Sequence, residues 1–76
     1  MSDKEVYLDV KGMLCPLPVL KARKRLKDLG VGTVLKVEAT DPVSVLDFPN
    51  YCTESGHELV DQTERDSVYT FWIRKQ

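Results

Sequence analysis

The chain has 76 residues, of which 42% are hydrophobic and 30% are charged, and its formal net charge is -1. This length fits one small domain with a modest core and excludes a buried cofactor pocket combined with a separate substrate pocket. The longest uncharged stretch, residues 12–20, is too short and too rich in proline to span a membrane.

The N-terminal residues contain no apolar stretch typical of a secretory signal, and the chain has two cysteines. Thiols in such a chain are more often catalytic or structural, in a reducing compartment, than disulfide-bonded. We therefore expect a cytoplasmic protein with a single domain over residues 1–76.

The first half of the chain predicts a strand, a helix and a second strand. Apolar residues alternate over residues 6–10, which is typical of a half-buried strand. In residues 18–29 the apolar positions recur at three- and four-residue steps, and Gly30 follows, so a helix is expected there. Alternation returns over residues 33–40 and predicts the second strand.

The second half predicts a helix and a hairpin. A helix is expected from residue 42 to about residue 55, kinked or divided at Pro49. Residues 57–63 and 68–74 are rich in β-branched and aromatic side chains and predict two strands joined by a turn around residues 65–67.

The order strand, helix, strand, helix, strand, strand predicts an α+β fold. Right-handed crossovers place both helices on one face of a four-stranded mixed sheet, which gives a two-layer α/β sandwich. The other face of the sheet is then uncovered. Tyr7, Val34 or Trp72 could lie there as a partner surface, although isolated exposed apolar residues are ordinary.

Basic residues are concentrated in one segment of the sequence. Residues 11–27 contain six Lys or Arg and no acidic residue. These are Lys11, Lys21, Arg23, Lys24, Arg25 and Lys27. Such a segment gives a positive surface that attracts acidic partners, and a merely solvated helix face is the alternative interpretation.

Cys15 lies in the sequence GMLCPLP, residues 12–18, between the first strand and the basic helix. A helix N-terminus and nearby cations favour a thiolate over a thiol, so we predict that the pKa of Cys15 is lowered. Pro16 and Pro18 hold the turn stiffly but remove two N–H donors. The amides left to stabilise a thiolate are those of Leu17, Val19 and Leu20.

Position 18, where a Cys-x-x-Cys redox motif would have its second thiol, is proline. A lone activated cysteine can still attack a sulfane sulfur and hold it as a persulfide, because a thiolate is both a good nucleophile and a good leaving group. A structural turn residue is the alternative. Cys52 is expected to be a core thiol, which leaves a regulatory Cys15–Cys52 disulfide open, and Cys52 and His57 are too few to bind a metal.

Along nearly its whole length the chain resembles the TusA-like, or SirA-like, family of sulfur carriers. The most specific match is the Cys-Pro-x-Pro signature between a strand and a helix. Further matching residues are Leu8-Asp9, Gly12-Met13-Leu14, Arg23-Lys24, Gly32, Asp41-Pro42, Asp47, Phe48, Cys52, residues 56–59 and residues 73–75. Position 17 is Leu where some members carry an acidic residue, so the motif does not fix the choice of partner.

The resemblance implies a sulfurtransferase that accepts sulfur as a persulfide on Cys15 and passes it on. The expected donor is a cysteine desulfurase or another persulfide donor, and the expected acceptor is a downstream protein. In the family such relays serve tRNA thiolation, molybdenum cofactor synthesis or sulfur oxidation. Independent turnover of a small molecule, a cofactor, a metal, a membrane partner and direct binding of nucleic acid are not expected.

The residues around Cys15 predict how partners dock. On a helical wheel Leu20 falls on the side away from the buried positions, so Leu14, Leu17 and Leu20 are expected to form an apolar collar beside the thiol. Arg23, Lys24 and Lys27 are expected to surround it as a basic rim, and such a centre and rim are typical of protein interfaces.

Three more residues near the same turn are assigned positioning or contact roles. Gly12, together with the two prolines, is expected to position the thiol. Asp41 is expected to cap the second helix, and it lies at the same sheet edge as Cys15, so a partner contact there is also predicted.

An RNA-binding module that uses the basic first helix is the rival interpretation. The sequence pI of about 5.7, the absence of any aromatic residue between Val10 and Phe48, and the lack of a Gly-rich RNA clamp argue against it. A regulatory protein-interaction domain with a vestigial cysteine is the third interpretation.

Overall fold

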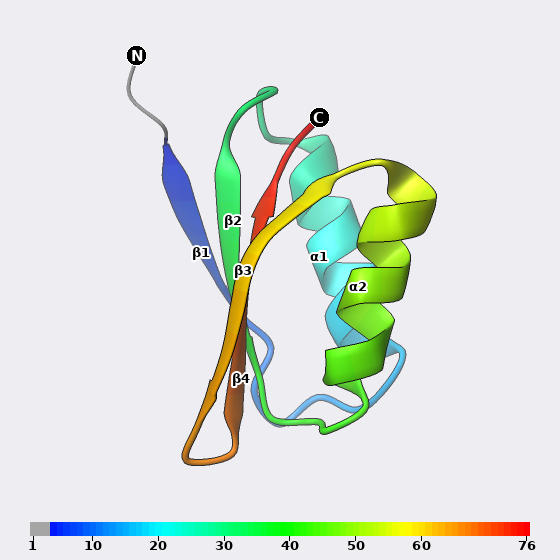
Figure 1. The fold of residues 1–76 in the computed structure, drawn as a ribbon, viewed down its shortest axis with the longest axis vertical. Helices are drawn as coiled ribbons and strands as arrows, with labels where there is room; N and C mark the ends of the chain where they lie inside the picture. The colour runs from blue at the N-terminus through cyan, green and yellow to red at the C-terminus, as the bar shows by residue number, and fades with distance from the viewer. Residues whose placement is uncertain (1–3) are drawn as a thin grey trace.

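Figure 1 shows the computed structural model of the chain, which describes residues 4–76. Residues 1–3 of the predicted domain lie outside the described residues. The elements are β1 (Glu5–Asp9), α1 (Leu17–Lys27), β2 (Val34–Ala39), α2 (Ser44–Ser55), β3 (Glu58–Arg65) and β4 (Val68–Arg74). The predicted order of strands and helices is confirmed.

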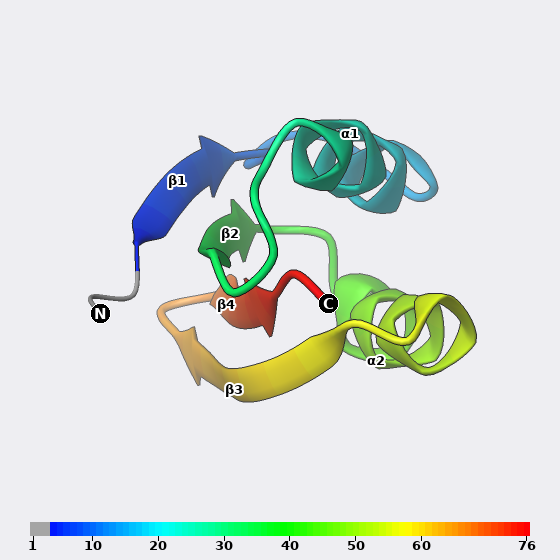
Figure 2. The same cartoon turned by 90° about the horizontal axis from the view of Figure 1, so that it is seen from above.

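The four strands form one mixed sheet in the order β1-β2-β4-β3. Strand β1 is parallel to β2, whereas β4 is antiparallel to both β2 and β3. Both helices cover the same face of this sheet, as the view from above shows (Figure 2). The predicted α+β two-layer sandwich is therefore confirmed.

Helix α1 ends at Lys27, two residues before the predicted end at Leu29. The amides of Asp28 and Leu29 donate to the carbonyls of Arg25 and Leu26, at 3.0 and 3.1 Å. These bonds span three residues instead of four, so the last turn tightens before the chain reaches Gly30.

Helix α2 begins at Ser44, two residues later than predicted, and runs without interruption to Ser55. The sequence predicted a helix kinked or divided at Pro49, and the structure shows that it is not divided there. Pro49 removes the N–H that would bond to the carbonyl of Val45. The helix continues to Ser55 without that hydrogen bond.

The hairpin between β3 and β4 turns at Asp66 and Ser67, both with positive φ, 52° and 64°. A two-residue turn of this kind matches the right-handed twist of paired strands. The turn lies where the sequence predicts it, and β3 extends two residues beyond its predicted end.

The core lies between the sheet and the helices. Leu35, Val37 and Ala39 of β2 are fully buried, which confirms the predicted alternation. Phe48 of α2 stacks on Phe71 of β4 with 4.5 Å between ring centroids. This contact fixes α2 against the centre of the sheet.

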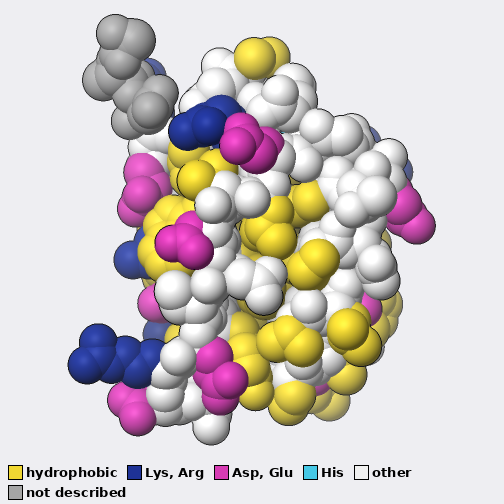
Figure 3. All heavy atoms as spheres, viewed as in Figure 1, with side chains coloured by type: hydrophobic (Ala, Val, Ile, Leu, Met, Phe, Trp, Pro, Cys, Tyr) yellow, Lys and Arg dark blue, Asp and Glu magenta, His cyan; other side chains and the backbone are white. Residues whose placement is uncertain are grey.

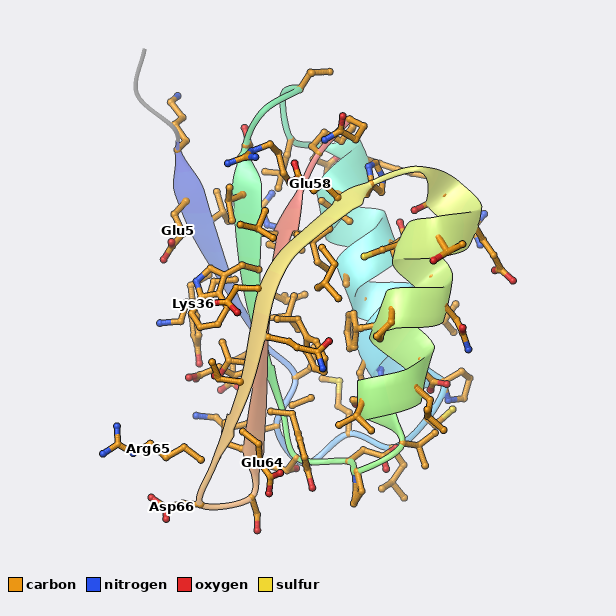
Figure 4. The ribbon with its side chains drawn as sticks, in the orientation of Figure 1. Glu5, Lys36, Glu58, Glu64, Arg65 and Asp66 are labelled. Carbon is orange, nitrogen blue, oxygen red and sulfur yellow. The ribbon has the colours of Figure 1, made fainter. Side chains whose placement is uncertain are left out.

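The uncovered face of the sheet carries Tyr7, Lys36 and Trp72 side by side in register. Figure 4 shows Lys36 pointing away from the helices, and its ammonium lies 5.7 Å from the centroid of the Trp72 ring. The Tyr7 hydroxyl donates a hydrogen bond to Glu38, and Val34 is only 8% exposed. Charged side chains thus interrupt the aromatic surface of this face.

Because β1 and β2 are parallel neighbours, the loops that follow their carboxyl ends lie at the same edge of the sheet. The loop after β1 contains Cys15, and the loop after β2 contains Asp41. Neither helix in residues 4–76 is long and apolar enough to cross a membrane.

Candidate functional site

Asp41 joins the two loops at this edge. One of its carboxylate oxygens accepts a hydrogen bond from the amide of Cys15 at 2.6 Å, and the other accepts one from the amide of Val43 at 3.1 Å. Asp41 is buried, with only 7% of its surface exposed. A second link runs from the amide of Gly12 to the hydroxyl of Thr40 at 2.9 Å. The backbone of Cys15 is thereby anchored to the loop before α2.

Gly12 and the two prolines shape the chain on either side of Cys15. Gly12 has a φ of +85°, a region that glycine enters without steric cost. Pro16 occupies the N-cap position of α1, the Cys15–Pro16 peptide bond is cis, and Pro18 is buried within the first turn. Cys15 itself is exposed.

Two of the amides that the sequence assigned to thiolate stabilisation have other partners. The amide of Leu17 donates to the carbonyl of Leu14 at 2.9 Å, and that of Leu20 donates to the carbonyl of Pro16 at 3.1 Å. These bonds close the turn and the first helical turn respectively. The start of α1 therefore offers fewer free donors to a thiolate than predicted.

The prediction of a lowered pKa for Cys15 is wrong, because carboxylates surround the thiol. A hydrogen bond to the Asp47 side chain raises the pKa of Cys15, and partial loss of water and the negative charges of Asp47 and Asp41 act in the same direction. The cations of α1 make no counteracting contribution there. Cys15 is thus held as a thiol with a carboxylate acceptor beside it.

Cys15 lines an open cavity of 320 Å³ between the two helices. Helix α1 contributes Val19, Leu20 and Arg23 to this cavity. The wall from α2 consists of Asp47, Asn50, Tyr51 and Glu54. The sequence analysis missed the role of this wall, although polar residues at three- and four-residue steps beside a buried stripe are a readable signal.

Exposed apolar residues occur near the start of both helices, and one of them, Leu20, lines the cavity. Leu14, Leu17 and Leu20 are 70%, 48% and 47% exposed, so the predicted exposure of Leu20 is confirmed. The start of α2 adds three exposed residues that the sequence analysis missed, namely Val43, Val45 and Leu46. Figure 3 shows hydrophobic side chains gathered at the end of the molecule where the helices begin. The predicted apolar collar of three leucines is thus extended by three residues at the start of α2, and from here on the apolar collar means all six.

The three basic residues of the predicted rim differ in which cavities they line. Arg23, Lys24 and Lys27 are all exposed. Arg23 lines both the cavity of Cys15 and a neighbouring cavity, Lys27 lines only the neighbouring cavity, and Lys24 lines neither. Asp41, which was also predicted to contact partners, offers little surface because of its burial.

Cys52 is buried at 4% exposure, which confirms its predicted core position. Burial raises the pKa of its thiol to about 11, so Cys52 stays protonated at neutral pH. Both cysteines are free. In the part of the chain that the structure describes, no three His, Cys, Asp or Glu residues are placed to hold a metal ion.

Sequence comparison finds close relatives over nearly the whole chain. Residues 6–75 match the family model described as Sulfurtransferase TusA. The chain is 44% identical over 72 residues to the sulfur carrier protein TusA of Pseudomonas paraeruginosa, covering 95% of this chain and 91% of that protein. It is 47% identical over 68 residues to that of Pseudomonas fluorescens, covering 90% and 82%.

Structure comparison gives the same result for the fold. The crystal structure of the SirA-like protein from Desulfitobacterium hafniense superposes with a TM-score of 0.81 at 28% sequence identity. The match covers 91% of this chain and 95% of that one.

Proposed function

The chain belongs to the sulfurtransferase TusA family of sulfur carriers, and from this membership we propose that Cys15 is the residue that carries the sulfur, as a persulfide. The observation that supports this assignment is an exposed thiol on an anchored loop, in a cavity between the two helices at the end of the molecule where exposed hydrophobic side chains gather (Figure 3). Cys52, the other thiol, is buried and protonated.

Loading is an exchange without net oxidation. The sulfur of Cys15 attacks the outer sulfur of the donor persulfide, the S–S bond of the donor breaks, and the donor leaves as a thiolate. Asp47, which lines the same cavity as Cys15 and raises the pKa of its thiol, takes up the proton, which then passes to the leaving thiolate. Unloading is the same exchange, with the acceptor's thiolate attacking the outer sulfur on Cys15.

A carrier of this family needs a sulfur donor and a sulfur acceptor. We propose a cysteine desulfurase or another protein persulfide as the donor, and a cysteine of a downstream protein as the acceptor, in the cytoplasm. tRNA thiolation, molybdenum cofactor synthesis and sulfur oxidation are the pathways in which such a relay serves.

Both partners dock at the same surface, the apolar collar with Arg23, Lys24 and Lys27 beside it. An apolar centre contributes most of the affinity of an interface, while charges at its edge steer association. The basic residues select acidic partner surfaces. Asp41, Gly12, Pro16 and Pro18 act indirectly, because they hold the Cys15 loop in place.

Intact mass spectrometry tests the assignment. The protein is incubated with a cysteine desulfurase and cysteine, and its mass is compared before and after treatment with a reductant. We expect the wild type and Cys52→Ser to gain one reducible sulfur atom, and Cys15→Ser to gain none. A sulfur gain by Cys15→Ser equal to that of the wild type would refute the proposal.

A further inference from the structure

A second cavity continues the groove between the helices beyond Cys15. It has a volume of 490 Å³ and shares Arg23, Tyr51 and Glu54 with the cavity of Cys15. Its remaining lining residues are Lys27, Ser55, His57 and Lys75. The two cavities together form one open groove that leads from the thiol towards the carboxyl end of α1.

Positive charge converges on this second cavity. Arg23, Lys27 and Lys75 line it, against the single carboxylate of Glu54. Within residues 4–76, the ion pairs join Lys11 to Glu38 and Arg74 to Glu58, and none involves these three cations. Clustered cations without carboxylate partners repel one another, and a bound anion relieves that repulsion.

Lys75 is held in a fixed position at the wall of the cavity. Its ammonium donates hydrogen bonds to the carbonyls of Leu26 and Leu29, at 2.6 and 3.1 Å, at the end of α1. An ammonium group has three N–H donors, so one remains for a ligand. A positioned donor loses less entropy on binding than a free lysine side chain.

His57 adds a neutral donor to the same cavity. Its Nδ1 atom accepts a hydrogen bond from the amide of Gln76 at 3.1 Å, so the proton of the neutral ring lies on Nε2. Burial and the charge of Lys75 lower the pKa of His57, which keeps the ring neutral at pH 7. The lining also includes Ser55 and Tyr51, both of which carry hydroxyl groups.

We propose that this basic cavity binds the anionic part, carboxylate or phosphate, of a low-molecular-weight thiol whose persulfide loads Cys15 directly. The cavity has the volume of a small-molecule site and opens into the groove that contains the thiol. This inference rests on the proposed function, because it assigns a second class of sulfur donor to Cys15.

The transfer balances without an oxidant. The sulfur of Cys15 attacks the outer sulfur of R–S–SH, the S–S bond of the small persulfide breaks, and RS⁻ leaves. The proton released by Cys15 ends on RS⁻, so the products are Cys15–S–SH and RSH. The cations of the groove hold the anionic end of R while its sulfur end reaches the thiol.

Binding is tested separately from sulfur transfer, with reduced glutathione as the carboxylate probe and coenzyme A as the phosphate probe. NMR titration of the Cys15→Ser chain follows the amide shifts of residues that line the basic cavity. We expect at least one probe to shift Lys27, Ser55 and His57, and Lys27→Gln to weaken that binding by about tenfold.

The matched control is Lys21→Gln, which removes the same charge from an exposed position of α1 outside both cavities. It should change the affinity less than about twofold, because distant exposed charges are screened. Equal weakening by both variants, or failure of both probes to bind at millimolar concentration, would overturn the proposal. The response to each probe identifies carboxylate or phosphate as the recognised group.

Loading kinetics give the second test. We expect glutathione persulfide or coenzyme A persulfide to load the wild type with saturation, and Lys27→Gln to raise the half-saturation concentration. The persulfide of N-acetylcysteamine, which lacks an anionic group, should load both proteins at equal rates. If Lys27→Gln slows only transfer from a protein donor, the cavity serves protein docking and the proposal fails. If a cysteine desulfurase loads Cys15 but the small persulfides do not, the proposal of a small-molecule donor fails and the proposed function stands. If neither the desulfurase nor the small persulfides load Cys15, the proposed function itself fails.

Discussion

Asp47 is the residue that most directly controls the Cys15 thiol. Its carboxylate places a hydrogen-bond acceptor and a negative charge near the thiol, and both raise the pKa of Cys15. A thiol with a raised pKa forms less thiolate at neutral pH, but each thiolate is a stronger nucleophile. The reactivity of the Cys15 thiol therefore depends on where the fold places Asp47.

The first prediction concerns the substitution Asp47→Asn. The amide keeps the size of the side chain but removes its negative charge, so the pKa of Cys15 falls and the thiolate fraction at any pH below it increases. The rate of alkylation by iodoacetamide, followed by mass spectrometry as a function of pH, should have its midpoint at lower pH than in the wild type. Asp28→Asn, an equal charge change at the far end of α1, should leave the midpoint in place; a midpoint unchanged in Asp47→Asn would contradict the assignment.

At this scale the sequence predicts burial better than electrostatics. Helical spacing correctly separates the exposed Leu20 from the buried Ala22 and Leu26, because it depends only on the period of the helix. The pKa of Cys15 depends on Asp47, which lies on another helix 32 positions later in the sequence. The packing of α2 against α1 decides which charges lie near the Cys15 thiol. This packing cannot be deduced from the residues next to Cys15 in the sequence.

The start of α2 and the start of α1 both contribute exposed apolar residues to the proposed docking surface. Val43, Val45 and Leu46 around the start of α2 are exposed, as are Leu14, Leu17 and Leu20 around the start of α1. Both helices begin at the same end of the molecule (Figure 1). Exposed apolar residues from two different elements form a contiguous patch only when the fold brings them together. Partners of this chain are thus expected to contact both helices.

Leu46→Lys tests this contact. Leu46 is 65% exposed, so a charged side chain there should change the free energy of unfolding by less than about 0.5 kcal/mol. Sulfur transfer from a protein donor should fall by at least about tenfold in kcat/KM, because a charge in an apolar interface centre is desolvated without a partner. Val31→Lys, at an 80% exposed position in the loop between α1 and β2, is the control and should transfer sulfur normally. Normal transfer by Leu46→Lys would exclude α2 from the docking surface.

The order and type of all six elements are predictable from the sequence, because their periods, glycines and turn residues are local signals. The exact ends of the elements are less predictable. Helix α2 continues through Pro49 because its packing through Phe48 outweighs one lost hydrogen bond, which is a tertiary effect. The exposure of the collar residues of α2 is not predictable from the sequence, because an apolar residue at a helix start gives no local sign of whether it is buried.

Lys75 ties the C-terminal end of the chain to the first helix. Its ammonium donates to two carbonyls at the end of α1, which are separated from it by 49 and 46 residues along the sequence. A cation at this position also interacts favourably with the negative end of the helix dipole. The two layers of the sandwich are thus joined by a polar contact as well as by the core.

Lys75→Met should therefore destabilise the whole molecule. Methionine keeps most of the aliphatic stem but leaves the two carbonyls without this donor, so the free energy of unfolding should fall by about 1–2 kcal/mol. Urea denaturation measures the change as a lower midpoint at constant slope. The control is Lys21→Met, at an exposed position of α1. It should change the free energy of unfolding by less than about 0.5 kcal/mol. Equal midpoints for Lys75→Met and the wild type would show that the contact contributes nothing.

The hydrogen bond from the Cys15 amide to Asp41 has a mechanical consequence for the whole relay. A loop pinned to a second loop does not swing, so the sulfur on Cys15 travels only when the entire protein diffuses. The reach needed to bring two sulfur atoms into contact must then be supplied by the other protein, through a mobile segment that carries its cysteine. The carrier thus presents its cysteine on a rigid loop, and the partners contribute the flexibility that sulfur transfer requires.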